Sequence, residues 1–271
     1  MSIKLYYQNS EDNFGDVLSK EVVSFLSGEE VVWSPLKKAD IVAIGSLGER
    51  VALKKMKRFF LCRGKSLDVW GTGFLEPGGQ VSQRFVNIYA LRGIYSRDRF
   101  DAGNVPLGDP GLLSSIVFPK DFKHHGAVVC LPHLHDRESE QWISEISNLY
   151  PNRQILTLSL SAPLEKIIAA IAGAEFVVST AMHPLIVAQS YSVPFVWLEG
   201  DAKLHPGARY KFEDYFSVFG TVPGTVSLQG LLTKASSVSD FSYVMDSSMV
   251  SIDKIHLIQQ DLIAAFPGQK R

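Results

Sequence analysis

Hydrophobic and polar positions follow two different periods in alternation along most of the chain. Short apolar runs rich in β-branched residues are followed by segments whose apolar positions recur every three or four residues. The first pattern is typical of strands and the second of amphipathic helices. In the first half we expect strands at 3–7, 41–44, 67–70 and 85–91, and helices at 15–26 and 49–58 and from Ser96, the expected N-cap, to 100. Such alternation predicts a parallel sheet covered on both faces.

A break near residue 110 separates two such halves. The run Gly108-Asp109-Pro110-Gly111 has turn chemistry, and the polar stretch 118–126 suits a linker. Beyond this break we expect strands at 128–131, 155–158, 176–179 and 194–198. We expect helices at 138–149, 163–172, 184–191 and 252–266. The pattern predicts an α/β protein of two Rossmann-like parallel-sheet domains, 1–117 and 118–271, with a terminal helix that can pack back on the first.

Polar side chains gather where the expected strands end. In open parallel sheets, ligands bind beyond the carboxyl ends of the strands. The polar residues expected there come from both halves: Asn13, Asp16, Ser46, Arg92, Asp109, His133, His135, Thr180, His183, Glu199 and Asp201. Two sheets facing a cleft lined by such loops have the architecture of B-type glycosyltransferases (GT-B), and we expect a GT-B-like fold.

Composition narrows the class of protein. The 271 residues include 27 Lys and Arg against 28 Asp and Glu, so the net charge of −1 gives no reason to expect a nucleic-acid partner. Cys62 and Cys130 lie far apart, which favours a reducing compartment. No apolar run reaches the roughly 18 residues of a membrane span, and the N-terminus lacks a signal-peptide pattern. We therefore expect a soluble, cytoplasmic protein.

Several short motifs occur in a recognisable order. They are Asn13-Phe14-Gly15-Asp16, Gly45-Ser46, Gly71-Thr72-Gly73, Leu91-Arg92-Gly93, Gly108-Asp109-Pro110-Gly111, Leu131-Pro132-His133, Ser179-Thr180-Ala181-Met182-His183 and Arg209-Tyr210-Lys211-Phe212. In this order the motifs resemble the polysaccharide pyruvyl transferase family, and especially the ketal pyruvyltransferases of xanthan-type exopolysaccharide assembly. The resemblance spans about residues 6–219.

The resemblance implies an activity and its partners. Such enzymes transfer a carboxyethylidene (pyruvyl ketal) group from phosphoenolpyruvate to two hydroxyls of a sugar and release phosphate. In the xanthan-type branch the acceptor is a lipid-linked oligosaccharide at the cytoplasmic face of the inner membrane. Many members carry Arg two residues before the histidine that is His183 here, where this chain has Ala181. Arg209 and Lys211 are the first candidates to supply the missing cation.

Phosphoenolpyruvate is a small polyanion and needs several cations. Its phosphate carries about −1.5 to −2 at neutral pH, by analogy with phosphorylated side chains, and its carboxylate adds another charge. Guanidinium groups bind both anions in bidentate fashion, and a helix N-terminus near His183 adds backbone N–H groups. The expected substrate-binding residues are Asn13, Ser46, Arg92, Arg97, Thr180, Arg209 and Lys211. Arg209 could instead pair with Asp214.

Transfer also requires a general acid and a general base. His183 is the first candidate for the acid or for a phosphate ligand; the alternative is an N-capping or packing histidine. His133 is a second ligand or base. Asp16 is a base or an acceptor-orienting group, or it merely stabilises a helix N-terminus by about 0.3–1 kcal/mol. Asp109 fits a turn better than a catalytic role.

Four histidines, His124, His125, His133 and His135, raise the question of a metal. Pro132 and Leu134 interrupt the second pair, and no Cys or Glu completes a usual zinc set. We therefore expect no metal and no cofactor, with phosphoenolpyruvate as the donor substrate.

The segment after residue 49 is strongly basic. It holds Arg50, Lys54, Lys55, Lys57 and Arg58, then Phe59-Phe60, and is extended by Arg63 and Lys65. Since each basic group near an anionic bilayer contributes about 1 kcal/mol, one interpretation is a face that rests peripherally on the inner membrane. The alternative is a solvated helix face, with Phe59-Phe60 beginning a buried strand.

Two other functions fit the same architecture. One is a nucleotide-sugar-dependent glycosyltransferase, for which Glu199 and Asp201 come close to an acidic pair that could bind a ribose. The other is a non-catalytic glycan-binding subunit, in which Ala181 marks a decayed site. Phosphate release from phosphoenolpyruvate separates the three, because a glycosyltransferase releases a nucleotide and a binding subunit releases nothing.

Overall fold

A computed structural model describes residues 2–8, 13–119, 122–200, 208–234 and 237–267. The chain divides into two compact units. Unit 1 comprises Met1–Leu113, Gly207–Thr221 and His256–Arg271, and unit 2 comprises Ser114–Pro206 and Val222–Ile255. The sequence predicted a boundary at 117/118 and a terminal helix that can pack back on the first domain. In the structure the chain crosses at 113/114 and then returns to unit 1 for two later segments.

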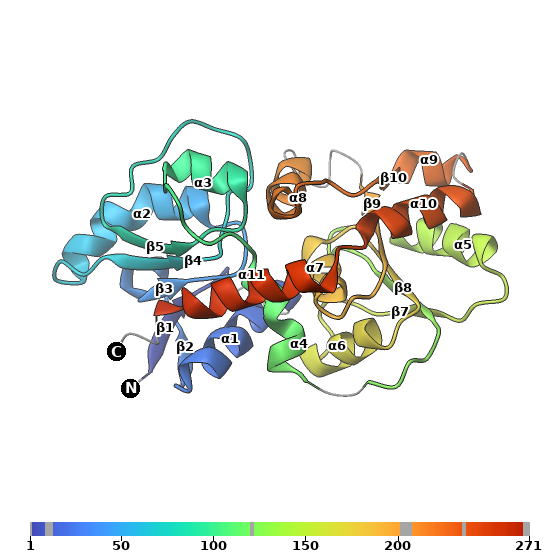
Figure 1. Ribbon diagram of the computed structural model, residues 1–271, viewed down its shortest axis with the longest axis horizontal. Helices are drawn as coiled ribbons and strands as arrows, with labels where there is room; N and C mark the ends of the chain where they lie inside the picture. Colours follow the sequence, from blue (N-terminus) through green and yellow to red (C-terminus); the bar gives the residue numbers. More distant parts are fainter. Residues whose placement is uncertain (1, 9–12, 120–121, 201–207, 235–236, 268–271) are drawn as a thin grey trace. The chain divides into compact units, whose positions relative to one another are not determined.

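Unit 1 is built on a sheet of five parallel strands in the order β2-β1-β3-β4-β5 (Figure 1). The strands are β1 Ile3–Tyr6, β2 Val31–Trp33, β3 Ile41–Val42, β4 Leu67–Trp70 and β5 Val86–Ala90. The helices are α1 Phe14–Ser27, η1 Leu36–Lys38, α2 Gly48–Leu61, α3 Ile94–Phe100, η2 Pro110–Leu113, α8 Ala208–Phe216, η3 Ser217–Phe219 and most of α11 Ile252–Ala264. The terminal helix is tied to the sheet, since Trp70 Nε1 donates to the Leu262 carbonyl at 3.0 Å.

Unit 2 repeats this plan with the strand order β10-β9-β8-β6-β7. Its strands are β6 Val128–Leu131, β7 Ile155–Thr157, β8 Phe176–Ser179, β9 Phe195–Glu199 and β10 Thr225–Ser227. Its helices are α4 Ser114–Val117, α5 Ser139–Leu149, α6 Leu164–Ala172, α7 Met182–Ser190, α9 Leu228–Leu232 and α10 Val238–Ser248. Every residue of β6 and β8 is buried, as expected for central strands of a sheet covered on both faces.

The order of the strands reverses at an equivalent point in both sheets. In each unit the first strand lies inside the sheet, the second strand pairs on one side of it and the third on the other. The strand order therefore switches between β1 and β3 in unit 1, and between β6 and β8 in unit 2. In doubly wound folds the loops leaving the carboxyl ends of these two strands diverge and form the ligand site. The expected α/β class, with a parallel sheet in each half, is confirmed.

Two local predictions are wrong. Ser96 is not an N-cap: α3 begins at Ile94 after the N-cap Gly93, and Ser96 lies inside the helix. Glycine is required at residue 93 because an added Cβ would lie 1.6 Å from the Asp214 carbonyl oxygen of α8. Residues 59 and 60 do not begin a strand, because α2 continues to Leu61. Within the described part of the chain, no helix is both long and apolar enough to cross a bilayer.

Candidate functional site

The loops that follow β6 and β8, on either side of the switch point of unit 2, are tied together by Thr180. Its Oγ1 accepts a hydrogen bond from the His133 backbone N–H at 3.0 Å and donates one to Asp136 Oδ2 at 2.9 Å. The same carboxylate oxygen accepts from Trp142 Nε1 at 2.9 Å. Asp136 is buried, so these bonds hold the two loops in one arrangement before any ligand binds.

A second hydroxyl makes a similar link below Thr180. Ser179 Oγ donates to the carbonyl of Leu131, the last residue of β6, and accepts from the Ala181 backbone N–H at 3.0 Å. Ser179 and Asp136 were not among the predicted site residues. Asp136 could have been predicted only as a turn residue. Its Oδ1 also accepts from the Glu138 backbone N–H at 3.1 Å, and this hydrogen bond forms a turn of the kind that commonly precedes a helix.

His133 has a defined tautomer in its neutral form. Its Nδ1 accepts a hydrogen bond from the His135 backbone N–H at 3.3 Å, and the two rings lie 5.5 Å apart. An accepting Nδ1 carries no proton, so the ring proton sits on Nε2. His133 can therefore donate a hydrogen bond to a ligand oxygen from Nε2. Among the described residues no group of three or more His, Cys, Asp or Glu is arranged to hold a metal ion.

His183 lies in the first turn of α7, directly after β8. The N-cap position belongs to Ala181, whose side chain makes no capping hydrogen bond, so the N-capping alternative for His183 is wrong. The His183 side chain is half-buried. The N-terminal end of α7 adds backbone N–H groups and a positive partial charge beside it. An anion at this end of the sheet would meet both.

In unit 1 the switch point is bordered by Asn13 and Asp16. Asn13 is the N-cap of α1 and accepts from the Gly15 N–H at 3.0 Å. Asp16 is buried, and its Oδ1 accepts from the backbone N–H of Gln8, beyond β1, at 3.3 Å. Burial, with a smaller contribution from Asp16, raises the pKa of Tyr7 nearby. Asn13 therefore caps α1, and Asp16 ties the first turn of α1 to the residues that follow β1.

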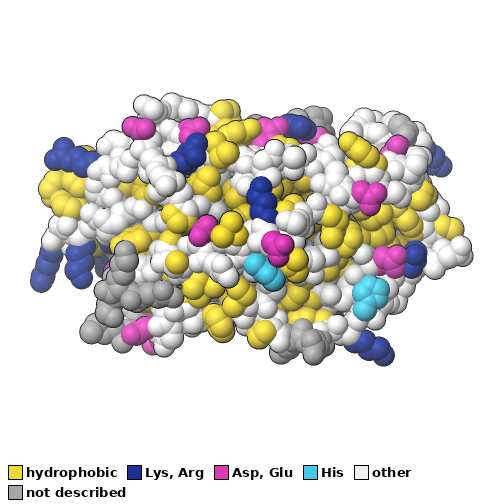
Figure 2. Space-filling model, in the orientation of Figure 1, with side chains coloured by type: hydrophobic (Ala, Val, Ile, Leu, Met, Phe, Trp, Pro, Cys, Tyr) yellow, Lys and Arg dark blue, Asp and Glu magenta, His cyan; other side chains and the backbone are white. Residues whose placement is uncertain are grey.

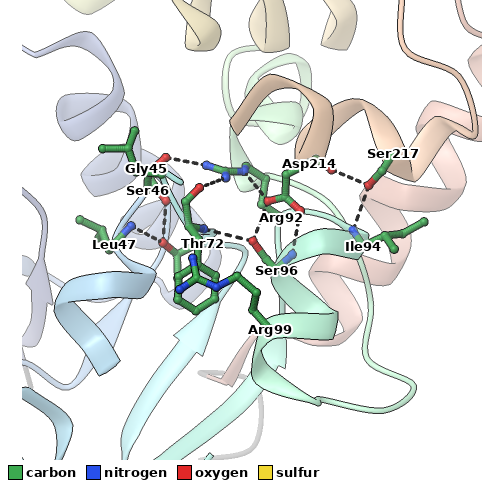
Figure 3. A network of polar contacts seen from close by, with 12 residues as sticks. Gly45, Ser46, Leu47, Thr72, Arg92, Ile94, Ser96, Arg99, Asp214 and Ser217 are labelled. Carbon is green, nitrogen blue, oxygen red and sulfur yellow. Dashed lines mark hydrogen bonds and ion pairs between the residues drawn. The ribbon is translucent and has the colours of Figure 1, made fainter. Parts of the chain in front are cut away.

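Arg92 stands at the centre of a buried polar network (Figure 3). Its guanidinium is fully buried and pairs with Asp214, Nε to Oδ2 at 2.9 Å. Nη1 donates to Ser46 Oγ at 2.7 Å, and Nη2 donates to the Phe74 carbonyl. Each of the three nitrogens therefore already has a protein acceptor. This arrangement gives Arg92 a structural task within unit 1, and through it fixes the hydroxyl of Ser46.

Asp214 joins α8 to α3 through the same network. Its Oδ1 accepts from the Ser96 backbone N–H at 2.9 Å, and its Oδ2 accepts from Ser96 Oγ at 2.6 Å. The alternative that Asp214 pairs with Arg209 is wrong. Arg209 Nε instead pairs with Glu213 at 2.7 Å, one helical turn away, where side chains on α8 face each other.

The other predicted cations differ in their ion pairs and in their exposure to solvent. Arg97 pairs with its neighbour Asp98 at 2.9 Å, and both side chains reach solvent. Arg209 is about half exposed. Lys211 is half-buried, and burial, assisted by the charge of Arg92, lowers its pKa to about 8. The four predicted cations all belong to unit 1, whereas His133, Thr180 and His183 belong to unit 2.

Asp109 is fully buried and lies close enough to Arg92 and Asp214 for their charges to affect its carboxyl group. Its Oδ1 accepts from the Gly111 backbone N–H at 2.9 Å, which confirms the predicted turn. Its Oδ2 has no hydrogen-bond partner among the described residues. Burial raises the pKa of Asp109 to about 6, and nearby Asp214 adds to this, while the Gly111 N–H and Arg92 act in the opposite direction. The group is therefore mostly protonated in the folded state at pH 5.

This acid predicts a specific loss of stability as the pH rises. An unfolded Asp has a pKa near 3.9, below the folded value of about 6. Asp109 therefore favours the folded state most below pH 4, and this preference is lost as pH rises through 6. The loss is about 3 kcal/mol, since each unit of pKa is worth 1.36 kcal/mol. The free energy of unfolding in urea should fall between acid and neutral pH in the wild type. In Asp109→Asn, which lacks the titrating carboxyl group, this fall should be smaller.

The matched control is Asp261→Asn, which changes an exposed carboxylate on α11. This variant should keep the pH slope of the wild type. An Asp109→Asn protein whose free energy of unfolding follows the wild-type slope between about pH 4.5 and 7.5 would show that Asp109 does not titrate as its burial requires.

Comparisons with known proteins agree with the order of motifs. The model of the family described as "Polysaccharide pyruvyl transferase" matches residues 3–201. The "Uncharacterized protein L143" of Acanthamoeba polyphaga mimivirus is 26% identical over 216 residues, which cover 73% of this chain and 72% of that protein.

Two solved structures are similar at low identity. The structure of E. coli heptosyltransferase WaaC with ADP matches with a TM-score of 0.39 and 14% identity, over 80% of this chain and 98% of that one. The glycosyl transferase family 9 protein from Veillonella parvula DSM 2008 matches with a TM-score of 0.36 and 11% identity, over 97% of both chains.

Proposed function

The chain belongs to the polysaccharide pyruvyl transferase family, and on that premise we propose that it is a ketal pyruvyltransferase that uses phosphoenolpyruvate. It transfers a carboxyethylidene group to two hydroxyls of one sugar in a lipid-linked exopolysaccharide repeat unit. A lipid-linked acceptor requires the enzyme to work at a membrane surface, and we propose peripheral association with the cytoplasmic face of the inner membrane.

The observation that carries this proposal is the position of the family motifs in the two sheets. The motif that contains Asn13 and Asp16 borders the switch point of unit 1, and the motifs that contain His133 and His183 border that of unit 2. Switch points are where doubly wound sheets bind small charged ligands. The α7 N-terminus and the two histidines suit the phosphate of the donor, whereas a carboxylate such as Asp16 suits a sugar hydroxyl.

The reaction balances without a cofactor. A general acid protonates the CH₂ carbon of phosphoenolpyruvate, which leaves an oxocarbenium-like centre at the carbon that bears the phosphate. One sugar hydroxyl attacks this carbon and loses its proton, and the bond from the carbon to the phosphate oxygen breaks. The second hydroxyl then attacks the same carbon and loses its proton. Of the two hydroxyl protons, one replaces the proton given by the acid, and the other leaves on hydrogen phosphate.

We assign roles by chemistry and position. His183 is the general acid, supported by its place at the positive end of α7. His133 binds the donor, and Thr180, whose hydroxyl proton is given to Asp136, holds the His133 loop in position. Asp16 accepts a proton from, or orients, the attacking hydroxyl. Arg97, Arg209 and Lys211 are the cations proposed to balance the charge of phosphoenolpyruvate. Arg92, whose nitrogens are engaged within the protein, orients Ser46 instead of binding the donor directly.

The proposal is tested by following phosphate. Purified protein is incubated with phosphoenolpyruvate and lipid-linked oligosaccharides, and released phosphate and acid-labile pyruvate on the glycan are measured. We expect both in equal amounts, and neither without acceptor. Release of a nucleotide from a nucleotide sugar, with no phosphate from phosphoenolpyruvate, would instead identify a glycosyltransferase.

Lys211 gives the proposed activity a predicted alkaline limit. Its pKa of about 8 means that the ammonium is lost as the pH rises past that value, and with it a charge that binds the donor. We expect kcat/KM for phosphoenolpyruvate to fall above pH 8, approaching tenfold per pH unit if this charge is essential. In Lys211→Arg the charge persists, because a guanidinium has a pKa above about 12, so the fall should move to higher pH.

The control for this profile is Lys20→Arg, which changes an exposed lysine on α1. It should reproduce the wild-type profile. Identical alkaline limits in wild type and Lys211→Arg would exclude Lys211 as the titrating group.

A further inference from the structure

The outward side of α2 carries apolar side chains where a surface helix normally carries charges. Four large hydrophobic residues are exposed on it: Leu53 (82%), Met56 (59%), Phe60 (70%) and Leu61 (56%). The inward side consists of Gly48, Val51, Lys55 and Arg58. Both sides of this helix therefore combine apolar and basic residues, and four large apolar side chains face outward.

Two of the cations counted in the basic segment are buried and do not face solvent. Arg58 is 1% exposed, and it donates to the Ala39 carbonyl at 2.8 Å and to the Lys65 carbonyl. Lys55 is also buried, and burial lowers its pKa. The alternative of a solvated, charged helix face is wrong for these two residues.

The ring of Phe60, one of the four exposed side chains, packs against two other aromatic rings. The Phe60 ring packs edge-on against Phe59, with centroids 5.7 Å apart, and lies 6.1 Å from the ring of Phe85. Phe59 and Phe85 are themselves 4.5 Å apart. Figure 2 shows hydrophobic side chains at the surface on the left of the view, where α2 lies in Figure 1, with Lys and Arg side chains beside them.

The charge around this apolar surface is predominantly positive. Residues 49–68 contain seven Lys and Arg, against Glu49 and Asp68 at the two ends of the range. The exposed cations on α2 and on the segments beside it, η1 among them, are Lys37, Lys38, Arg50, Lys54, Lys57, Arg63 and Lys65. Apolar side chains bordered by cations on one face of a helix suit the boundary between the headgroups and the acyl chains of an anionic bilayer. A second copy of this chain fits less well, because two such faces would oppose like charges.

We propose that the α2 face, formed by Leu53, Met56, Phe60 and Leu61 with Lys54 and Lys57, docks unit 1 on anionic lipid. The helix lies in the plane of the bilayer, its apolar side chains reach the acyl boundary, and the lysines contact lipid phosphates. The biological purpose of this docking rests on the proposed function, since it brings a transferase to a lipid-linked acceptor. The docking itself requires neither donor nor acceptor.

Vesicle flotation tests this docking. The full chain is mixed with vesicles of phosphatidylcholine alone, or of phosphatidylcholine with phosphatidylglycerol. We expect flotation with the anionic vesicles, and its loss at high salt. Leu53→Ser with Phe60→Ser should lower the bound-to-free ratio at least about tenfold, and Lys54→Glu with Lys57→Glu should do the same.

The matched control replaces exposed hydrophobic residues elsewhere. Tyr243→Ser with Leu257→Ser removes side chains that are exposed to a similar extent on α10 and α11, and should leave flotation unchanged. All variants should melt at the wild-type temperature. Wild-type protein that fails to float with anionic vesicles would overturn the proposal, as would undiminished flotation of the Leu53→Ser, Phe60→Ser variant. A wild-type dimer that this variant dissociates, without vesicle binding, would assign the α2 face to a second copy.

These assays distinguish a failure of the docking proposal from a failure of the proposed function. With a water-soluble oligosaccharide acceptor, the Leu53→Ser, Phe60→Ser variant should release phosphate at the wild-type rate, because the change affects only access to lipid. Flotation without any phosphate release would leave the docking intact and refute the proposed function. Phosphate release without flotation would do the reverse.

Discussion

Replacing His183 with alanine is expected to lower kcat for phosphate release from phosphoenolpyruvate by about 100- to 10,000-fold, the usual contribution of a positioned general acid. Protonation of the CH₂ carbon creates the electrophile, so removing the acid slows the step that starts the reaction. His183→Asn adds a second measurement, because the amide can still donate a hydrogen bond to phosphate but cannot act as the acid. It should lower kcat almost as far while changing KM little.

His256→Ala is the control for these variants, since His256 is an exposed histidine on α11. It should keep full activity. If His183→Asn instead raises KM with kcat unchanged, His183 acts as a phosphate ligand. Full ketal transfer by a folded His183→Ala protein would remove it from the site altogether.

The second large effect is on stability and comes from the buried Arg92–Asp214 ion pair. Arg92→Met leaves the buried Asp214 carboxylate without its ionic partner. Asp214→Leu likewise leaves the buried Arg92 guanidinium without its partner. Removal of one partner of a buried pair costs about 3–5 kcal/mol. The double variant should lose much less than the sum of the two single losses, because no unpaired charge remains. Urea unfolding of the four proteins, followed by tryptophan fluorescence, measures this difference.

Arg209→Met serves as the control for the ion pair. Its pair with Glu213 is partly exposed and lies one helical turn away on α8, and such a pair contributes about 0.3–0.5 kcal/mol. Its loss should therefore change the free energy of unfolding by less than 1 kcal/mol. Single variants of Arg92 and Asp214 that lose no more than Arg209→Met would contradict the network in Figure 3.

The sequence predicts central elements better than edges. β6 and β8 are found at the predicted residues, because burial on both faces leaves a continuous apolar run with clear ends. β2 and β10, which have three residues each and lie at an edge of their sheets, were not predicted. β7 has the same length and also lies at an edge, but it was predicted within the run 155–158.

The site was predictable in its loops but not in its long-range pairs. The positions of His133 and Thr180 follow from strand ends that the sequence shows. The pair between Arg92 and Asp214 joins residues 122 positions apart, through a return of the chain to unit 1 that no local pattern signals. The exposure of apolar side chains on α2 was not predicted for a related reason. Periodicity shows that one side of a helix is apolar, but the fold decides which side is buried.

If the protein is a ketal pyruvyltransferase, the carbon chain of phosphoenolpyruvate ends on a glycan. The most direct test is transfer of label from phosphoenolpyruvate labelled in its carbon chain to the lipid-linked acceptor, followed by mild acid. We expect labelled glycan in an amount equal to the phosphate released, with the label recovered as free pyruvate after acid. Phosphate release without labelled glycan, or label that resists mild acid, would contradict the proposed function.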